Sequence, residues 1–179
     1  DFVEFPSQFN ENWALDPVVF ANYAKHYKTG EPMPAELDAK IKKSSTFNQG
    51  YATTEYVAAA LLDMAWHQLP ADAPRQDADA FEADALKKYG VAVDEVPPRY
   101  RSTYFQHIWS NGYSAGYYAY LWTAVLAQDA FAWFTEHGGL KRENGQHFED
   151  TVLSRGGTKD AHQLYLDFRG QEPSVEPYL

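Results

Sequence analysis

The sequence contains no cysteine among its 179 residues. Without thiols the chain can have no disulfide framework, no cysteine nucleophile and no cysteine-ligated zinc. Basic residues are few relative to acidic ones, 15 against 25, which gives a net charge of −10. A negative surface repels phosphate backbones and anionic lipids, so we expect neither nucleic acid nor a membrane as partner. No apolar run approaches the roughly 18 residues of a membrane-spanning helix.

Aromatic residues, in contrast, are abundant: 5 Trp, 13 Tyr and 11 Phe. With 45% hydrophobic residues, the chain has the composition of a folded protein. Its length suits one core, so we expect residues 1–179 to form a single helical domain. Residues 91–99 contain Pro97 and Pro98 and should be irregular, which makes them the candidate sub-boundary.

Apolar residues recur with the period of an α-helix along most of the chain. The first such stripe consists of Phe2, Phe5, Phe9 and Trp13. Asp16 followed by Pro17 is typical of a helix start. Helices are expected over residues 2–13, 17–30, 34–41, 51–69, 77–89, 117–137, 143–153 and 159–168, with an extended tail after Pro173. Residues 91–93 are the only strand candidate, so the sequence predicts an all-α chain.

A row of polar side chains accompanies the first aromatic stripe. Glu4, Gln8 and Glu11 follow helical spacing, which places them side by side. Carboxylate oxygens can ligate zinc, but a solvated face of an amphipathic helix is the more common reason for such a row. From spacing alone, the solvated face is favoured.

The six histidines do not form a familiar metal motif. The sequence has no HExxH, no HxxxH and no Glu-x-x-His. Asp63 and His67 stand one helical turn apart and could share either a metal or a hydrogen bond. The hydrogen bond is favoured, because two residues do not make a metal site.

Residues 112–116 match G-x-S-x-G, with Ser114 in the place of a nucleophile. In serine hydrolases of the α/β type this motif follows a buried strand. Residues 104–111 make a poor strand and no parallel strands are evident. Serine hydrolysis through Ser114 is therefore only a minor alternative.

Tyrosines crowd the stretch after this turn. A helix that begins near Ser114 would place Tyr117 and Tyr120 on one face and leave Tyr113 in the turn. Phenols are neutral donors at pH 7 and could stabilise an oxyanion, although they could equally pack in a core. Gly112 and Gly116 bracket the turn, as a closing loop would require.

These constellations together resemble the M3 family of zinc metallopeptidases, the thimet oligopeptidase group. The resemblance covers the whole chain and rests on residues 1–8 (DFVEFPSQ), 10–13 (NENW) and 107–122 (HIWSNGYSAGYYAYLW), with shorter matches at 143–145, 153–156 and 168–170. It implies that Glu4 is the third zinc ligand and that Tyr113 and Tyr120 are transition-state donors. It further implies that His107 faces the substrate and that Tyr117 lines the cleft.

Within the family, four segments are most similar to the peptidyl-dipeptidases, which remove dipeptides from peptide C-termini: residues 3–6 (VEFP), 47–51 (FNQGY), 60–64 (ALLDM) and 96–102 (VPPRYRS). The resemblance implies the C-terminal, multi-helix part of a zincin-type catalytic domain. The family's HExxH is absent here, so we expect two further zinc ligands and the general base to lie outside this chain. The chain alone should bind zinc poorly and be inactive.

The expected partners are short peptide substrates and the N-terminal part of the same enzyme. The expected compartment is the cytoplasm, with the periplasm as the alternative. The competing interpretation is a non-enzymatic all-α interaction module. A peptidase needs Glu4, His107, Tyr113 and Tyr120 on one concave wall, whereas a module would scatter them or bury the phenols.

Overall fold

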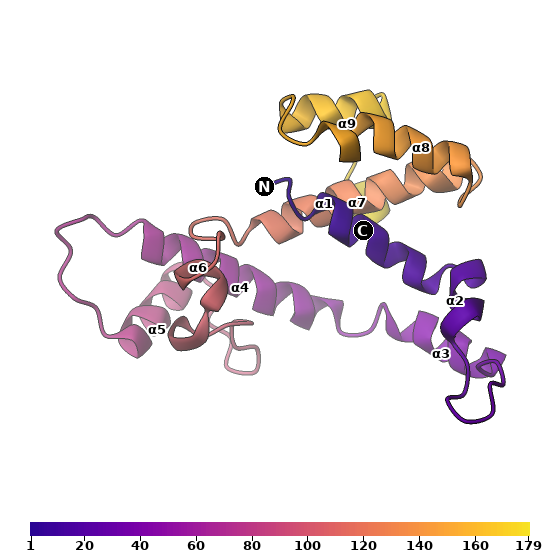
Figure 1. The fold of residues 1–179 in the computed structure, drawn as a ribbon. Coiled ribbons are helices and arrows are strands. Elements are labelled where there is room, and N and C mark those ends of the chain that lie inside the picture. Colours follow the sequence, from indigo (N-terminus) through magenta and orange to yellow (C-terminus); the bar gives the residue numbers. More distant parts are fainter. The chain divides into compact units, whose positions relative to one another are not determined.

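A computed structural model describes residues 1–179, and helices are its only extended regular elements (Figure 1). The α-helices are α1 Phe5–Glu11, α2 Pro17–Tyr23, α3 Ala35–Ser44, α4 Gln49–His67, α5 Ala78–Lys88, α6 Gln106–Trp109, α7 Ala119–Glu136, α8 Arg142–Thr151 and α9 Ala161–Arg169. Short 3-10 helices are η1 Asn12–Leu15, η2 Ser102–Tyr104, η3 Leu153–Arg155 and η4 Glu176–Tyr178. The predicted all-α class is confirmed. Residues 91–93 do not form a strand, since Val93 makes only an isolated bridge with Val96.

The chain divides into two compact units. Unit 1 comprises residues 1–32 and 119–179, and unit 2 comprises residues 33–118. The irregular residues 91–99 lie inside unit 2, between α5 and η2. Two compact units can belong to one domain, so the single-domain expectation and its sub-boundary at 91–99 stay predictions.

Unit 1 is built around an aromatic core to which α1 and α7 contribute. The rings of Phe5 and Phe9 are fully or almost fully buried, and Phe9 lies 4.6 Å from the ring of Phe148 and 5.0 Å from that of Phe134. Tilted and edge-on aromatic pairs of this kind add to the free energy gained from burying their area. The predicted aromatic stripe is therefore the face by which α1 packs into the unit.

Unit 2 packs α5 against α4, where the rings of Trp66 and Phe81 are 3.9 Å apart. Small residues of α4, Ala58 and Ala59, are fully buried. The unit also buries Glu82 of α5, whose carboxylate accepts hydrogen bonds from the backbone and hydroxyl of Ser102 at 2.8 and 3.0 Å. Buried charge of this kind is stable only when hydrogen bonds satisfy it.

Two predicted segments differ from the structure. Helix α2 ends at Tyr23 instead of reaching Gly30, because the chain turns back through a bridge between Lys25 and Pro32. Gly30 supplies the positive φ of 73° that this turn requires. The tail after Pro173 is not extended throughout, since Pro177 stands in the first turn of η4, where its fixed φ suits a helix start.

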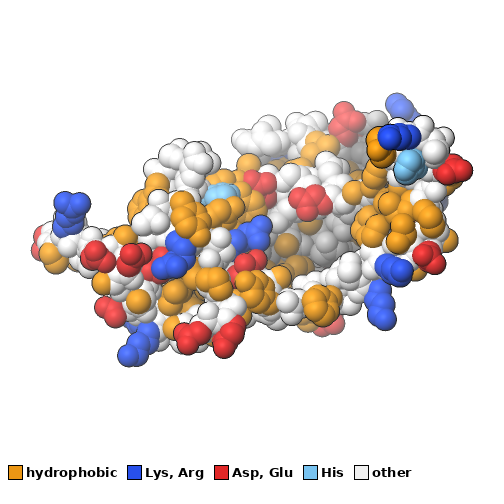
Figure 2. All heavy atoms as spheres, turned by 90° about the horizontal axis from the view of Figure 1, so that it is seen from below, with side chains coloured by type: hydrophobic (Ala, Val, Ile, Leu, Met, Phe, Trp, Pro, Cys, Tyr) orange, Lys and Arg blue, Asp and Glu red, His pale blue; other side chains and the backbone are white.

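The surface mixes side chains of different kinds. Figure 2 shows acidic side chains interspersed with basic and hydrophobic ones on the face that it presents. None of the helices is long and apolar enough to cross a bilayer.

Candidate active site

Glu4 directly precedes α1, in the position that caps the helix N-terminus. Its side chain is half-buried, and Ser7 of the first turn donates its hydroxyl to Glu4 Oε2 at 2.6 Å. The same hydroxyl lies 2.9 Å from the Glu4 carbonyl oxygen. A carboxylate is also favoured at this end of a helix by the helix dipole. The first turn of α1 therefore holds the Glu4 carboxylate in a defined position.

Gln8 joins α1 to the first turns of α7. Its Nε2 donates to the carbonyl oxygen of Tyr120 at 3.0 Å, and its Oε1 accepts from the buried hydroxyl of Thr123. Both amide functions of Gln8 are thus used within unit 1. The row of Glu4, Gln8 and Glu11 is not one solvated face, because its middle member is turned onto α7. The structure therefore places Glu4 at the start of a helix that Gln8 connects to the helix of Tyr120.

The residues of this chain do not make a metal site by themselves. No group of three or more His, Cys, Asp or Glu side chains is arranged to hold an ion. Asp63 and His67 form a pair, with 2.8 Å between Asp63 Oδ1 and His67 Nδ1. This distance agrees with the prediction that Asp63 and His67 share a hydrogen bond. Glu4 is one carboxylate, whereas protein zinc sites take at least three protein ligands.

His107, Tyr113 and Tyr117 come together in unit 2. The ring of His107, in α6, lies 5.9 Å from that of Tyr113 and 5.3 Å from that of Tyr117. Tyr100 completes the group, 4.9 Å from His107. The Tyr113 amide donates to the His107 carbonyl at 3.2 Å. The ring of Tyr117 is 3% exposed and stacks on that of Tyr56.

The turn after α6 is held by a carboxylate rather than opened by its glycines. Ala115, not Gly112 or Gly116, has a left-handed backbone, with φ of 55°. Asp63 accepts hydrogen bonds from the amides of Ala115 and Tyr117, both at 2.9 Å. Helix α7 begins only at Ala119, after the left-handed Ala115 and the turn of residues 112–118. The prediction that Tyr117 and Tyr120 share a helix face was therefore wrong.

Asp63 is the residue near the predicted site whose structural contacts sequence reasoning underestimated. It lies in α4 directly after the apolar run 58–62 and is completely buried. An acidic residue on an otherwise buried helix face needs partners, and this was the signal in the sequence. What the sequence could not show is that the partners are two amides more than fifty residues away along the chain.

Ser114 does not have the surroundings of a hydrolase nucleophile. The residues before its turn form α6, not a strand. Its hydroxyl donates to the carbonyl oxygen of Ile108 at 2.6 Å. Both features disagree with the serine-hydrolase alternative.

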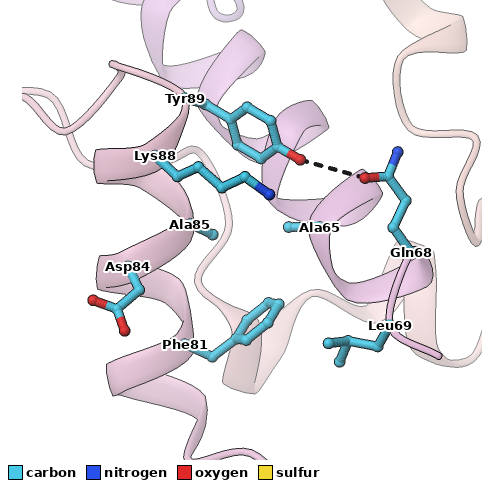
Figure 3. Close-up of a pocket in the computed structure, with 8 residues that line it drawn as sticks. All are labelled: Ala65, Gln68, Leu69, Phe81, Asp84, Ala85, Lys88 and Tyr89. Atoms are coloured by element: carbon cyan, nitrogen blue, oxygen red, sulfur yellow. Dashed lines mark hydrogen bonds between the residues drawn. The ribbon is translucent and has the colours of Figure 1, made fainter. Parts of the chain in front are cut away.

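A separate pocket of about 280 Å³ lies between α4 and α5 in unit 2 (Figure 3). Its lining consists of Ala65, Gln68, Leu69, Phe81, Asp84, Ala85, Lys88 and Tyr89. Across it, the Tyr89 hydroxyl donates to Gln68 Oε1 at 3.4 Å. None of the five predicted site residues lines this pocket.

The chain is all-α and carries a histidine and tyrosines around a turn that a buried carboxylate holds. The model of Peptidase family M3 matches residues 1–179, so the chain belongs to this family, whose members are metallopeptidases.

Similar proteins include the dipeptidyl carboxypeptidases of Escherichia coli (strain K12) and Salmonella typhimurium, 53% and 54% identical over 179 residues. Oligopeptidase A of Escherichia coli is 42% identical over 180 residues. Each alignment covers 100% of this chain and 26% of the relative. The chain thus spans about a quarter of the length of these curated relatives.

Proposed function

We propose that this chain is part of a metallopeptidase that releases dipeptides from the C-termini of short peptides. The observation that carries the proposal is the match to Peptidase family M3 along all 179 residues. The dipeptide specificity is supported by the higher identity to the two dipeptidyl carboxypeptidases than to oligopeptidase A, 53–54% against 42%. Short peptides are accordingly the proposed substrates, and the rest of the same enzyme is the proposed partner.

The metal that we propose is zinc, with Glu4 as one ligand and two further ligands outside this chain. The donor set of this chain, a single carboxylate, does not fit a complete zinc site. What supports Glu4 is its fixed position: Ser7 holds the carboxylate at the start of α1, and Gln8 ties that helix to α7. A ligand that is already oriented loses little freedom when a metal binds.

For the protein part of the mechanism, we assign hydrogen-bond donation to Tyr113 and Tyr120. A peptide carbonyl under attack by water becomes a tetrahedral oxyanion, and preorganised neutral donors stabilise that charge. A phenol keeps its proton at pH 7 and can therefore donate throughout the reaction. His107 would face the substrate beside Tyr113, and Tyr117 would form the wall behind them.

The test is a product analysis with the full-length, metal-loaded enzyme. Peptides with a free C-terminus and the same peptides with an amidated C-terminus are incubated and analysed by mass spectrometry. We expect stepwise loss of dipeptides from the free acids only. Cleavage at internal bonds irrespective of the terminus would contradict the dipeptidase specificity. Absence of any hydrolysis would return the chain to the interaction-module interpretation.

Metal dependence is tested separately. Removal of the metal with a chelator should abolish hydrolysis, and zinc at one equivalent should restore it. If another divalent ion restored hydrolysis and zinc did not, the proposal that the metal is zinc would be contradicted. The metallopeptidase proposal would remain intact. The cytoplasmic location, with the periplasm as the alternative, stays a prediction.

A further inference from the structure

Asp63 is a carboxylate buried in unit 2 whose oxygens are both used. Oδ1 accepts from the Ala115 amide at 2.9 Å and lies 2.8 Å from Nδ1 of His67. Oδ2 accepts from the Tyr117 amide at 2.9 Å. Burial of a carboxylate is costly unless such partners compensate for the lost water. The site is therefore built so that α4 holds the backbone of residues 115–117.

The two amides that Asp63 binds flank Gly116, in the turn that carries Tyr113. Ala115 has the left-handed φ of 55°, which an alanine adopts only at a cost in free energy. Further bonds tie the same turn to its own unit: the Tyr56 hydroxyl donates to the Tyr117 carbonyl, and the Ser114 hydroxyl to that of Ile108. Of these bonds, the two from Asp63 are the ones made by a fully buried charged group. Their loss should release the turn.

We propose that Asp63 is a positioning residue of the peptidase site, which fixes residues 113–117 so that Tyr113 is presented to the substrate. This inference rests on the proposed function for its catalytic consequence. The structural part, a carboxylate that orders the turn, rests on the four distances from Asp63 alone. His67 Nδ1 also lies 2.9 Å from the Asp63 carbonyl oxygen. Asp63 and His67 therefore contact each other within one turn of α4.

The first test is Asp63→Asn in the full-length enzyme. Asparagine keeps the size of the side chain but replaces one acceptor oxygen by an NH2 donor, so one of the two amides loses its acceptor. We expect faster hydrogen exchange at Ala115 and Tyr117, and a kcat lowered roughly tenfold or more because a displaced donor no longer meets the transition state. KM should change much less.

Glu82→Gln is the matched control. Glu82 is a second buried carboxylate of unit 2, only 2% exposed, and it accepts from the amide and hydroxyl of Ser102. Its substitution removes a comparable charge but leaves the anchor of the turn in place. We expect faster hydrogen exchange near Ser102. The kcat of this variant should stay close to that of the wild-type enzyme. Equal loss of kcat in both variants would mean a general structural role and would overturn the proposal.

A double-mutant cycle with Tyr113→Phe tests whether Asp63 acts through that tyrosine. If it does, Asp63→Asn should add little to the loss of kcat that Tyr113→Phe already causes. Losses that multiply fully would contradict positioning of Tyr113.

If Asp63→Asn does not fold, hydrogen exchange of the wild-type enzyme provides the test. The Ala115 and Tyr117 amides should be protected as well as the buried part of α4, and rapid exchange would show that Asp63 does not hold the turn. A protein without peptidase activity would refute the proposed function, whereas amide exchange would still test the anchor.

Discussion

The two units of the molecule hold their predicted site residues in different ways. In unit 1, Glu4 directly precedes α1 and Tyr120 belongs to α7, and these two helices are braced by aromatic rings and by Gln8. In unit 2, His107 precedes a turn and Tyr113 lies in it, and a buried carboxylate of α4 holds that turn. Helix-borne groups owe their positions to packing, whereas turn-borne groups owe them to a few hydrogen bonds that a single substitution can remove.

Buried acids show the same contrast. In unit 1, Asp129 of α7 binds side chains of α9: the Tyr165 hydroxyl at 2.5 Å and the Arg169 guanidinium at 3.2 Å. In unit 2, Asp63 accepts from backbone amides of the turn after α6, and Glu82 accepts from the Ser102 amide at the start of η2 and pairs with the Arg101 side chain. An acid in unit 1 therefore joins helices, while the two acids of unit 2 shape turns.

The largest effect is expected for Glu4→Ala in the full-length enzyme. Loss of the carboxylate removes the proposed metal ligand, so bound zinc and peptidase activity should both be lost. Glu11→Ala, an exposed acid on the same helix, serves as the control and should keep both. Metal analysis of the purified variants decides, and an unchanged zinc content in Glu4→Ala would remove Glu4 from the ligand set.

Asp129→Ala should destabilise unit 1 by about 3–5 kcal/mol, because it leaves the buried Tyr165 phenol without its partner and the largely buried Arg169 with only the exposed Glu136 carboxylate. Its control is Glu136→Ala, which removes the exposed carboxylate on the same arginine and should cost about 0–1 kcal/mol. Urea unfolding of both variants measures the two costs. Similar values would show that the buried acid does not brace α7 and α9.

Tyr120→Phe should lower kcat by roughly 10²–10³, about 2.7–4 kcal/mol, with little change in KM. The substitution deletes only the hydroxyl, while the backbone bond from Gln8 to residue 120 remains. Tyr104→Phe, at an exposed tyrosine of η2, is the control and should leave both constants unchanged. Steady-state kinetics separate the cases, and a raised KM with an intact kcat would point to ground-state binding instead.

The alkaline stability of unit 1 should depend on Tyr165. Burial and the hydrogen bond to Asp129 raise the pKa of the Tyr165 hydroxyl above its usual value near 10. Above about pH 10 the unfolded chain loses this proton and the folded one keeps it, so stability falls by about 1.4 kcal/mol per pH unit. Thermal unfolding between pH 9 and 11 should be less pH-dependent in Tyr165→Phe. Equal slopes in both proteins would contradict the assignment.

The smallest effect is expected for Ala115→Gly. Glycine adopts positive φ without steric cost, so relief of strain should stabilise the turn by about 1 kcal/mol, partly offset by the greater entropy of the unfolded chain. The free energy of unfolding should rise slightly or stay constant. A loss of stability beyond about 1 kcal/mol would mean that packing of the Ala115 methyl group contributes more free energy than the backbone strain costs.

Much of the fold could be predicted from local patterns. The aromatic stripe of α1, the Pro start of α2 and the long helices α4 and α7 follow from the periods and end signals of the sequence. Such signals act within a few residues, so one sequence contains all the information they need. Errors occurred where a turn competed with a helix, as after Tyr23 and before Ala119.

The candidate site could be predicted from the sequence only in part. Glu4, His107, Tyr113, Tyr117 and Tyr120 were named from their residue types and from a family resemblance, and their joint role in one cleft stays a prediction. The contact of Gln8 with α7 could not be found from spacing, because the same spacing describes a solvated face. The conformation of residues 115–117 could not be predicted either, because the Asp63 carboxylate that holds it comes from α4.

By itself, the sequence determined the all-α class, the family and the residues that could carry chemistry, because periodicity and motif are properties of neighbouring residues. Only the tertiary structure decided that Gln8 joins two helices and that Asp63 shapes the turn of Tyr113. Hydrogen bonds of buried groups depend on which segments meet in space. Those meetings are set by the packing of the whole unit and leave no mark in the local pattern.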